Sequence, residues 1–130
     1  MDRIDLHVEV IPVPFRELTN FTSSESSSTI RERVIKASKI QEQRFKGNSG
    51  IHCNAQIPSK KLHVLCTISE EGQVLLKNAM DRINLSARAY NRILKVSRTI
   101  ADLEGSSSIL TEHLAEAIQY RSLDRETWGA

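Results

Sequence analysis

The stretch from Ser86 to Leu103 has the clearest hydrophobic period in the chain, and it constrains the fold more than any other segment. Steps of four, four, three, four and three residues separate the apolar positions Leu85, Ala89, Ile93, Val96, Ile100 and Leu103. This spacing places them on one side of an α-helix. Gly105 and three serines break the pattern. The sequence therefore predicts a long amphipathic helix that buries one flank.

Further helices are predicted on either side of this segment. Thr29 with Glu32 fits a capping box, which predicts a helix over 29–44. Ser69 is followed by two glutamates and predicts the start of a helix that ends near Asn84. A last helix is expected from the apolar positions Ile109, Leu110, Leu114, Ala117, Ile118 and Leu123. Residues 59–68 fit a short helix or a strand equally well.

The N-terminal residues 4–10, IDLHVEV, alternate between apolar and polar side chains. This period of two predicts a half-buried strand, and Pro12 and Pro14 end it. No equally good partner strand follows, so we expect its sheet to lie elsewhere. The predicted fold class is mainly α, a small helical bundle with an N-terminal extended arm that carries one strand.

The predicted organisation is one domain with flanking segments. We expect an extended arm over 1–21, a serine-rich linker over 22–28, a helical domain over 29–125 and a tail over 126–130. The chain is 39% hydrophobic and 26% charged, which is ordinary for a globular protein. No apolar run approaches the roughly 18 residues that span a bilayer, and no secretory signal is present. We therefore expect a cytoplasmic protein with no membrane partner and two reduced cysteines.

Positive charge is concentrated in the segment with the best helical pattern. The cations Arg82, Arg88, Arg92, Lys95 and Arg98 follow one another with no acid between them. Arg88, Arg92 and Lys95 share one helical face, about a quarter turn from the apolar stripe. Such a row either binds phosphate or is a solvated surface.

The sequence holds no motif for independent catalysis. A GxxxxGK[ST] phosphate loop and a GxGxxG turn are both missing, and no serine, histidine and acid arrangement supports nucleophilic chemistry. His52 and Cys53 are adjacent, which fits poorly with zinc-ligand spacing toward His63 and Cys66. We predict no metal site and no enzymatic activity for this chain alone.

Three segments resemble the C-terminal region of magnesium-chelatase-like AAA+ ATPases of the YifB/ComM family. They are DRIDLHVEV at 2–10, LSARAYNRILKVSRTIADL at 85–103 and HLAEAIQYRSLDR at 113–125. The middle segment is the most specific, because it matches over a long ungapped run. The resemblance implies that the chain is the lid of a larger ATPase. The phosphate loop, the metal-binding acids and a Lon-protease-like domain would then precede this chain.

The resemblance also implies roles for particular residues. Arg3 matches an arginine finger that reaches the ATP of a neighbouring subunit, and Arg88 matches the second-sensor arginine that reaches the γ-phosphate. A guanidinium suits both tasks, since it offers permanent charge and a fixed fork of donors to a phosphoryl group. ATP and Mg²⁺ would be the ligands of the longer protein. Three alternatives stay open for Arg92, Lys95 and Arg98: contact with a neighbouring subunit, contact with DNA, or exposure to solvent.

Two functional interpretations follow. In the first, the chain is the lid of a hexameric AAA+ motor that acts on DNA, as competence or recombination helicases do. Its partners would be its own preceding AAA+ and Lon-protease-like domains and the neighbouring subunits. In the second, the chain is a free-standing helical module that binds nucleic acid through the basic helix 86–103. No residue supports insertion of magnesium into a porphyrin.

Overall fold

The computed structural model describes residues 4–10, 12 and 24–126, with side chains as far as Arg121. The predicted residue Arg3, most of the predicted arm over 1–21 and the end of the tail lie outside the described residues. The elements are α2 (Ser27–Arg44), η1 (Asn54–Gln56), η2 (Ser59–Lys61), α3 (Leu62–Leu65), α4 (Glu70–Ile83), α5 (Ala87–Glu104) and α6 (Thr111–Glu126). The predicted mainly helical class is confirmed, and residues 59–65 form helical turns rather than a strand.

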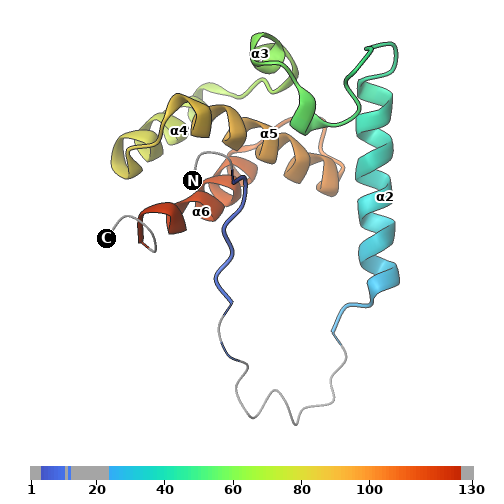
Figure 1. Cartoon of the computed structure of the whole chain (residues 1–130), viewed down its shortest axis with the longest axis horizontal. Coiled ribbons are helices and arrows are strands. Elements are labelled where there is room, and N and C mark those ends of the chain that lie inside the picture. The colour runs from blue at the N-terminus through green and yellow to red at the C-terminus, as the bar shows by residue number, and fades with distance from the viewer. Residues whose placement is uncertain (1–3, 11, 13–23, 127–130) are drawn as a thin grey trace.

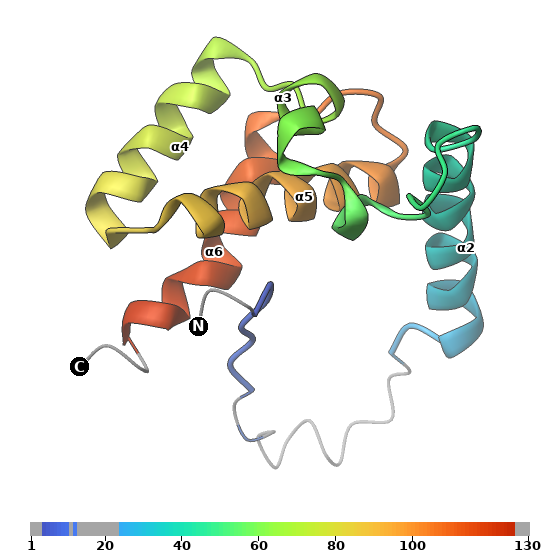
Figure 2. The same ribbon diagram turned by 45° about the horizontal axis from the view of Figure 1, so that its top comes forward.

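Helix α5 lies at the centre of the described structure (Figures 1 and 2). It contacts α6, α2, η1 and α3, while α4 packs on α6. Figure 1 shows α2 standing crosswise to α5, beside its C-terminal end. A Cβ atom added at Gly72 in α4 would lie 2.7 Å from Cδ1 of Leu114 in α6, so these two helices meet closely at a glycine.

The helix starts are set by serine side chains. Ser69 Oγ accepts from Gly72 N at 3.1 Å and Ser86 Oγ accepts from Ala89 N at 3.1 Å. Each bond satisfies a backbone donor that the first turn of a helix leaves without a partner. The capping box predicted at Thr29 is wrong, because Ser26 accepts from Thr29 N at 3.2 Å and α2 begins at Ser27. An earlier hydroxyl in the serine-rich segment takes the capping position.

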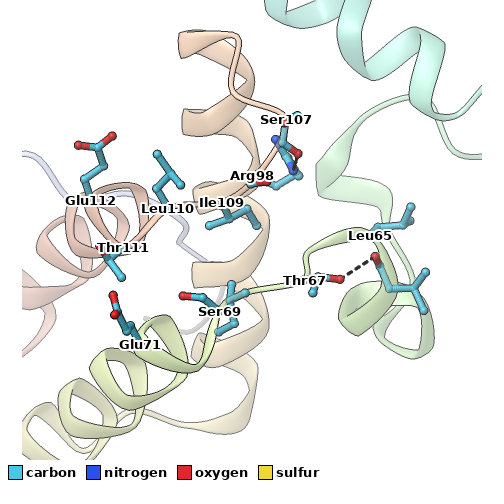
Figure 3. Close-up of a pocket in the computed structure, with 13 residues that line it drawn as sticks. Leu65, Thr67, Ser69, Glu71, Arg98, Ser107, Ile109, Leu110, Thr111 and Glu112 are labelled. Atoms are coloured by element: carbon cyan, nitrogen blue, oxygen red, sulfur yellow. Dashed lines mark hydrogen bonds between the residues drawn. The ribbon is translucent and has the colours of Figure 1, made fainter.

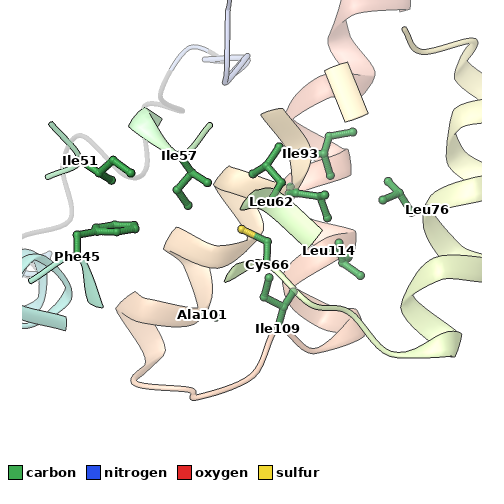
Figure 4. Packing of buried hydrophobic residues seen from close by; sticks show 12 residues of the cluster. Phe45, Ile51, Ile57, Leu62, Cys66, Leu76, Ile93, Ala101, Ile109 and Leu114 are labelled. Atoms are coloured by element: carbon green, nitrogen blue, oxygen red, sulfur yellow. The ribbon is translucent and has the colours of Figure 1, made fainter. Parts of the chain in front are cut away.

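The core is mostly aliphatic and gathers around α5 (Figure 4). Ala89 and Ile93 of the predicted stripe are each 1% exposed, but Leu103 is 38% exposed. The remaining buried positions of α5 are Leu94, Ser97, Arg98, Ala101 and Asp102. The predicted stripe is therefore correct as far as Ile100, since Leu85, Val96 and Ile100 are half-buried and pack against the core, and it fails at Leu103. Toward the C-terminus the buried face is rotated, because α2, η1 and the loop before α6 cover that side.

The strand predicted over residues 4–10 does not form. These residues are extended but carry no regular secondary structure, and the only bridge pairing among the described residues joins Ile68 to Ile109. A strand needs a neighbour for its backbone groups, and the described part of the chain offers none beside this segment. Its apolar side chains stay largely exposed, from 44% at Ile4 to 86% at Val10.

None of the described helices combines the length and the apolar character needed to cross a bilayer.

Candidate functional site

A groove of about 640 Å³ runs along α5, between the N-terminal segment, the η turns and α6. We call it the basic groove, because Arg88, Arg92 and Lys95 all line it. Three positions of the predicted apolar stripe line the same groove, namely the half-buried Val96 and Ile100 and the exposed Leu103. The structure thus brings together three of the four cations that the sequence singled out on α5, and adds an apolar surface beside them.

The three cations differ in how they are engaged. Arg92 pairs with Asp5 at 2.5 Å, and the Lys95 ammonium donates to the Ala55 carbonyl at 3.1 Å. Arg88 is exposed and makes no hydrogen bond or ion pair with any described residue. Among the described residues, Arg88 is thus the cation of this groove that has no partner, and it is also the side chain with the best-defined predicted role.

The position of Arg88 is unfavourable for the helix that carries it. Arg88 is the second residue of α5, and the first turn of this helix contains no acid. A cation near the positive end of a helix dipole is destabilising by roughly 0.3–1 kcal/mol. Helix α4 shows the usual arrangement, with Glu70 and Glu71 in its first turn. The contrast indicates that Arg88 does not stabilise its own helix.

Arg98 lies away from the basic groove. Its side chain is 7% exposed, and its guanidinium donates to the carbonyls of Ser106 and Ser107 at 2.8 and 3.2 Å. It also lies 3.3 Å from the carboxylate of Asp102. Arg98 thus fastens the loop between α5 and α6.

Sequence reasoning missed a buried polar network centred on Asp102, whose side chain is 0% exposed. Arg44 of α2 forms two hydrogen bonds with this carboxylate, at 2.7 and 2.9 Å, and Asn54 Nδ2 donates to it at 3.0 Å. The hydrogen bond to Asp102 raises the pKa of Arg44, which favours the charged form of this guanidinium. The spacing of Arg98 and Asp102, one helical turn apart, was the available signal.

A second cavity, of about 690 Å³, lies between the start of α4 and the start of α6 (Figure 3). Its polar groups already serve the fold. Thr67 Oγ1 donates to the carbonyls of His63 and Val64 at 3.0 and 3.1 Å, and Ser69 caps α4. The carboxylates of Glu71 and Glu112 line it, which disfavours an anion. The basic groove therefore remains the candidate site.

One group of metal-ligand type exists among the described residues, formed by Glu104, Glu112 and His113. His113 is 1% exposed, and its Nδ1 accepts from Leu110 N at 2.9 Å. The ring proton of the neutral imidazole must then be on Nε2, which lies 2.7 Å from Glu104 Oε2 and donates to it. A metal would need the Nε2 lone pair, so this arrangement fits a capping contact in the first turn of α6 and not a metal site.

Fold and groove together define a small helical domain whose central helix presents cations to a ligand or a partner. The family model "Magnesium chelatase, subunit ChlI C-terminal" matches residues 24–121. The chain is 42% identical over 126 residues to "Competence protein ComM" of Haemophilus influenzae and 36% identical to "Uncharacterized protein YifB" of Escherichia coli. The chain therefore belongs to the magnesium chelatase ChlI C-terminal family, and the predicted resemblance is confirmed.

The matches cover almost all of this chain but only a small part of each relative. The matches to the ComM and YifB proteins include 96% of this chain but 24% of the length of each relative. "Uncharacterized protein Rv2897c" of Mycobacterium tuberculosis is 31% identical over 121 residues and is covered to the same extent, 24%. The chain thus corresponds to about a quarter of each of these proteins.

Proposed function

We propose that this chain is the C-terminal lid domain of a magnesium-chelatase-like AAA+ ATPase. Membership of the family supports the proposal, as does the coverage of about a quarter of the relatives. In this role the lid moves as a helical unit and transmits ATP binding and hydrolysis to the rest of a ring. Helix α5 suits such a lever, because it packs against both α6 and α2.

The observation that carries the proposal is the state of Arg88. Its guanidinium is exposed beside the basic groove, while Arg92 and Lys95 are engaged with other groups of the chain. An exposed guanidinium can donate two parallel hydrogen bonds to a γ-phosphate and stabilise its charge. Arg88 would act as the second-sensor residue, and the phosphate loop would lie in the part of the protein that precedes this chain.

The wider assembly belongs to the same proposal. Arg3 would serve as the arginine finger toward a neighbouring subunit of a hexameric ring, with ATP and Mg²⁺ bound by the preceding AAA+ domain. The donors of the basic groove are cations, which suit phosphate oxygens and not Mg²⁺. A relative is named as a competence protein, which favours DNA as the substrate of the ring.

ATP turnover of the full-length protein with Arg88→Ala tests the central role. We expect kcat to fall by about tenfold to a thousandfold, since a phosphate-stabilising charge is removed from the transition state. Arg82→Ala is the matched control, because Arg82 is an exposed arginine in the last turn of α4. Turnover of Arg88→Ala equal to that of Arg82→Ala would exclude the second-sensor role.

A free-standing nucleic-acid-binding module is the second candidate, favoured by the row of three cations in one groove. It requires affinity of this chain alone for DNA, with log K falling steeply against log salt as counterions are released. Titration with single- and double-stranded DNA at low and at moderate ionic strength separates the candidates. Undetectable binding at low ionic strength excludes the second one.

A further inference from the structure

We propose that Arg92 and Arg121 form a clamp that holds residues 4–7 against α5 and α6 and so fixes this segment relative to Arg88. We call residues 4–7 the clamped segment and the two arginines the arm clamp. The clamp itself is independent of the proposed function, whereas its effect on ATP turnover rests on that function.

Three contacts join three residues of this four-residue segment to two helices. Asp5 pairs with Arg92 of α5 at 2.5 Å, and the His7 backbone N–H donates to the Tyr120 carbonyl of α6 at 3.0 Å. The Arg121 guanidinium donates to the Ile4 carbonyl. The partners are separated by 87, 113 and 117 residues in sequence. Contacts this closely spaced fix both the position and the direction of a segment.

The two arginines contribute in different ways. Arg121 is 1% exposed, and a buried guanidinium needs acceptors for its donors, so the Ile4 carbonyl satisfies part of that need. The side chains of Arg92 and Asp5 are 28% and 48% exposed, so their ion pair is screened by solvent. Arg121 is therefore the anchor of the clamp, and Arg92 is the weaker contact that a ligand or a motion can break.

The clamp links two parts of the chain that the proposed function uses together. Arg92 follows Arg88 by one helical turn, and both line the basic groove with Asp5. Arg92 is thus a positioning residue that ties the clamped segment, which directly follows the predicted arginine finger in the sequence, to the helix that carries the predicted second sensor.

Amide hydrogen exchange of His7, measured by NMR on this chain, tests the clamp without ATP. We expect Asp5→Asn and Arg92→Gln each to speed exchange of this amide by about two- to fivefold, the range for a partly exposed ion pair. The charge swap Asp5→Arg with Arg92→Asp restores slow exchange. Glu9→Gln is the matched control, since Glu9 is an exposed acid of the same segment. Unchanged exchange in both single variants overturns the clamp.

Turnover of the full-length protein tests the coupling separately. We expect Arg92→Asp to lower kcat for ATP several-fold with KM nearly unchanged, and Asp5→Arg in the same protein to recover most of the loss. A loss of turnover unrelated to the contact between Asp5 and Arg92 would not be recovered by the swapped pair. Full turnover of Arg92→Asp, combined with a deficient Arg88→Ala variant, overturns the coupling and leaves the proposed function intact. Full turnover in both variants overturns the coupling and the proposed function together.

Discussion

Arg92 and Arg98 lie on the same helix, and their guanidinium groups meet opposite surroundings. Arg92 lines an open groove and pairs with a partly exposed acid of the N-terminal segment. Arg98 is 5% exposed and is surrounded by two loop carbonyls and the buried Asp102. The N-terminal half of α5 thus presents its cations outward, and the C-terminal half uses a cation to hold the fold together.

This difference shows why a row of cations in a sequence does not define a binding surface. A helix has several faces, and the turn on which a residue lies decides whether neighbouring elements cover it. Near Arg88 the groove remains open, whereas α2, η1 and the α5–α6 loop close around Arg98 and Asp102. We therefore expect stability effects from the C-terminal half of α5 and functional effects from the N-terminal half.

The largest expected effect is that of Asp102→Asn. This change leaves Arg44 and Arg98 without the carboxylate that balances them in a buried site, so the free energy of unfolding falls by about 3 kcal/mol. Urea denaturation followed by circular dichroism measures it. Asp81→Asn, at an exposed position of α4, is the control and changes the value by less than about 0.5 kcal/mol. Equal effects at the two sites would show that the network adds nothing.

The next prediction compares the stability effects of one arginine substitution in each half of α5. Arg98→Gln lowers the free energy of unfolding by about 2 to 3 kcal/mol, because two loop carbonyls and the buried Asp102 lose a charged donor. Arg88→Gln changes it by less than about 0.5 kcal/mol, since Arg88 is exposed. The same denaturation curves measure both. Comparable losses would mean that the two halves do not differ.

The next prediction tests whether water is excluded from the buried site that Cys66 shares with Arg98 and Arg44, beside the C-terminal half of α5. Burial raises the pKa of the Cys66 thiol to about 11, although Arg98 and Arg44 oppose the shift. Above pH 9 the unfolded thiol ionises while the folded one keeps its proton, so stability falls as pH rises. The loss attributable to Cys66 reaches about 2 kcal/mol near pH 11. It is measured as the difference between the wild type and Cys66→Ala in the slope of stability against pH. Equal slopes for the wild type and Cys66→Ala would show that water reaches this thiol.

The smallest expected effect concerns the N-cap that precedes Arg88. Ser86→Ala removes the acceptor of the Ala89 N–H, which lowers the free energy of unfolding by about 1 kcal/mol. Ser38→Ala, at an exposed interior position of α2, is the control and is neutral or slightly stabilising, since alanine is the better helix former. Thermal unfolding measures both variants. A neutral result at Ser86 would show that water replaces the cap.

Local features of the fold were predictable from sequence because they depend on neighbouring residues. Ser69 and Ser86 cap the helices they were expected to start, and Asn84 ends α4 in a left-handed conformation with φ of 57°. The capping box at Thr29 failed because several hydroxyls precede the helix, and sequence does not rank them. The strand over 4–10 failed because alternation describes a half-buried strand but supplies no partner for it.

The sequence by itself determined the helical class, the serine caps and the shared face of Arg88, Arg92 and Lys95, because these follow from the period of a helix and from hydroxyl chemistry. Its resemblance to a family also predicted the membership that the comparisons confirm. Only the tertiary structure decided that Arg98 is buried, that Asp102 balances two arginines and that Asp5 reaches Arg92. Those contacts depend on how elements pack together, and most of them join residues far apart in the chain. The local spacing of residues predicts the period of a helix but does not predict such packing.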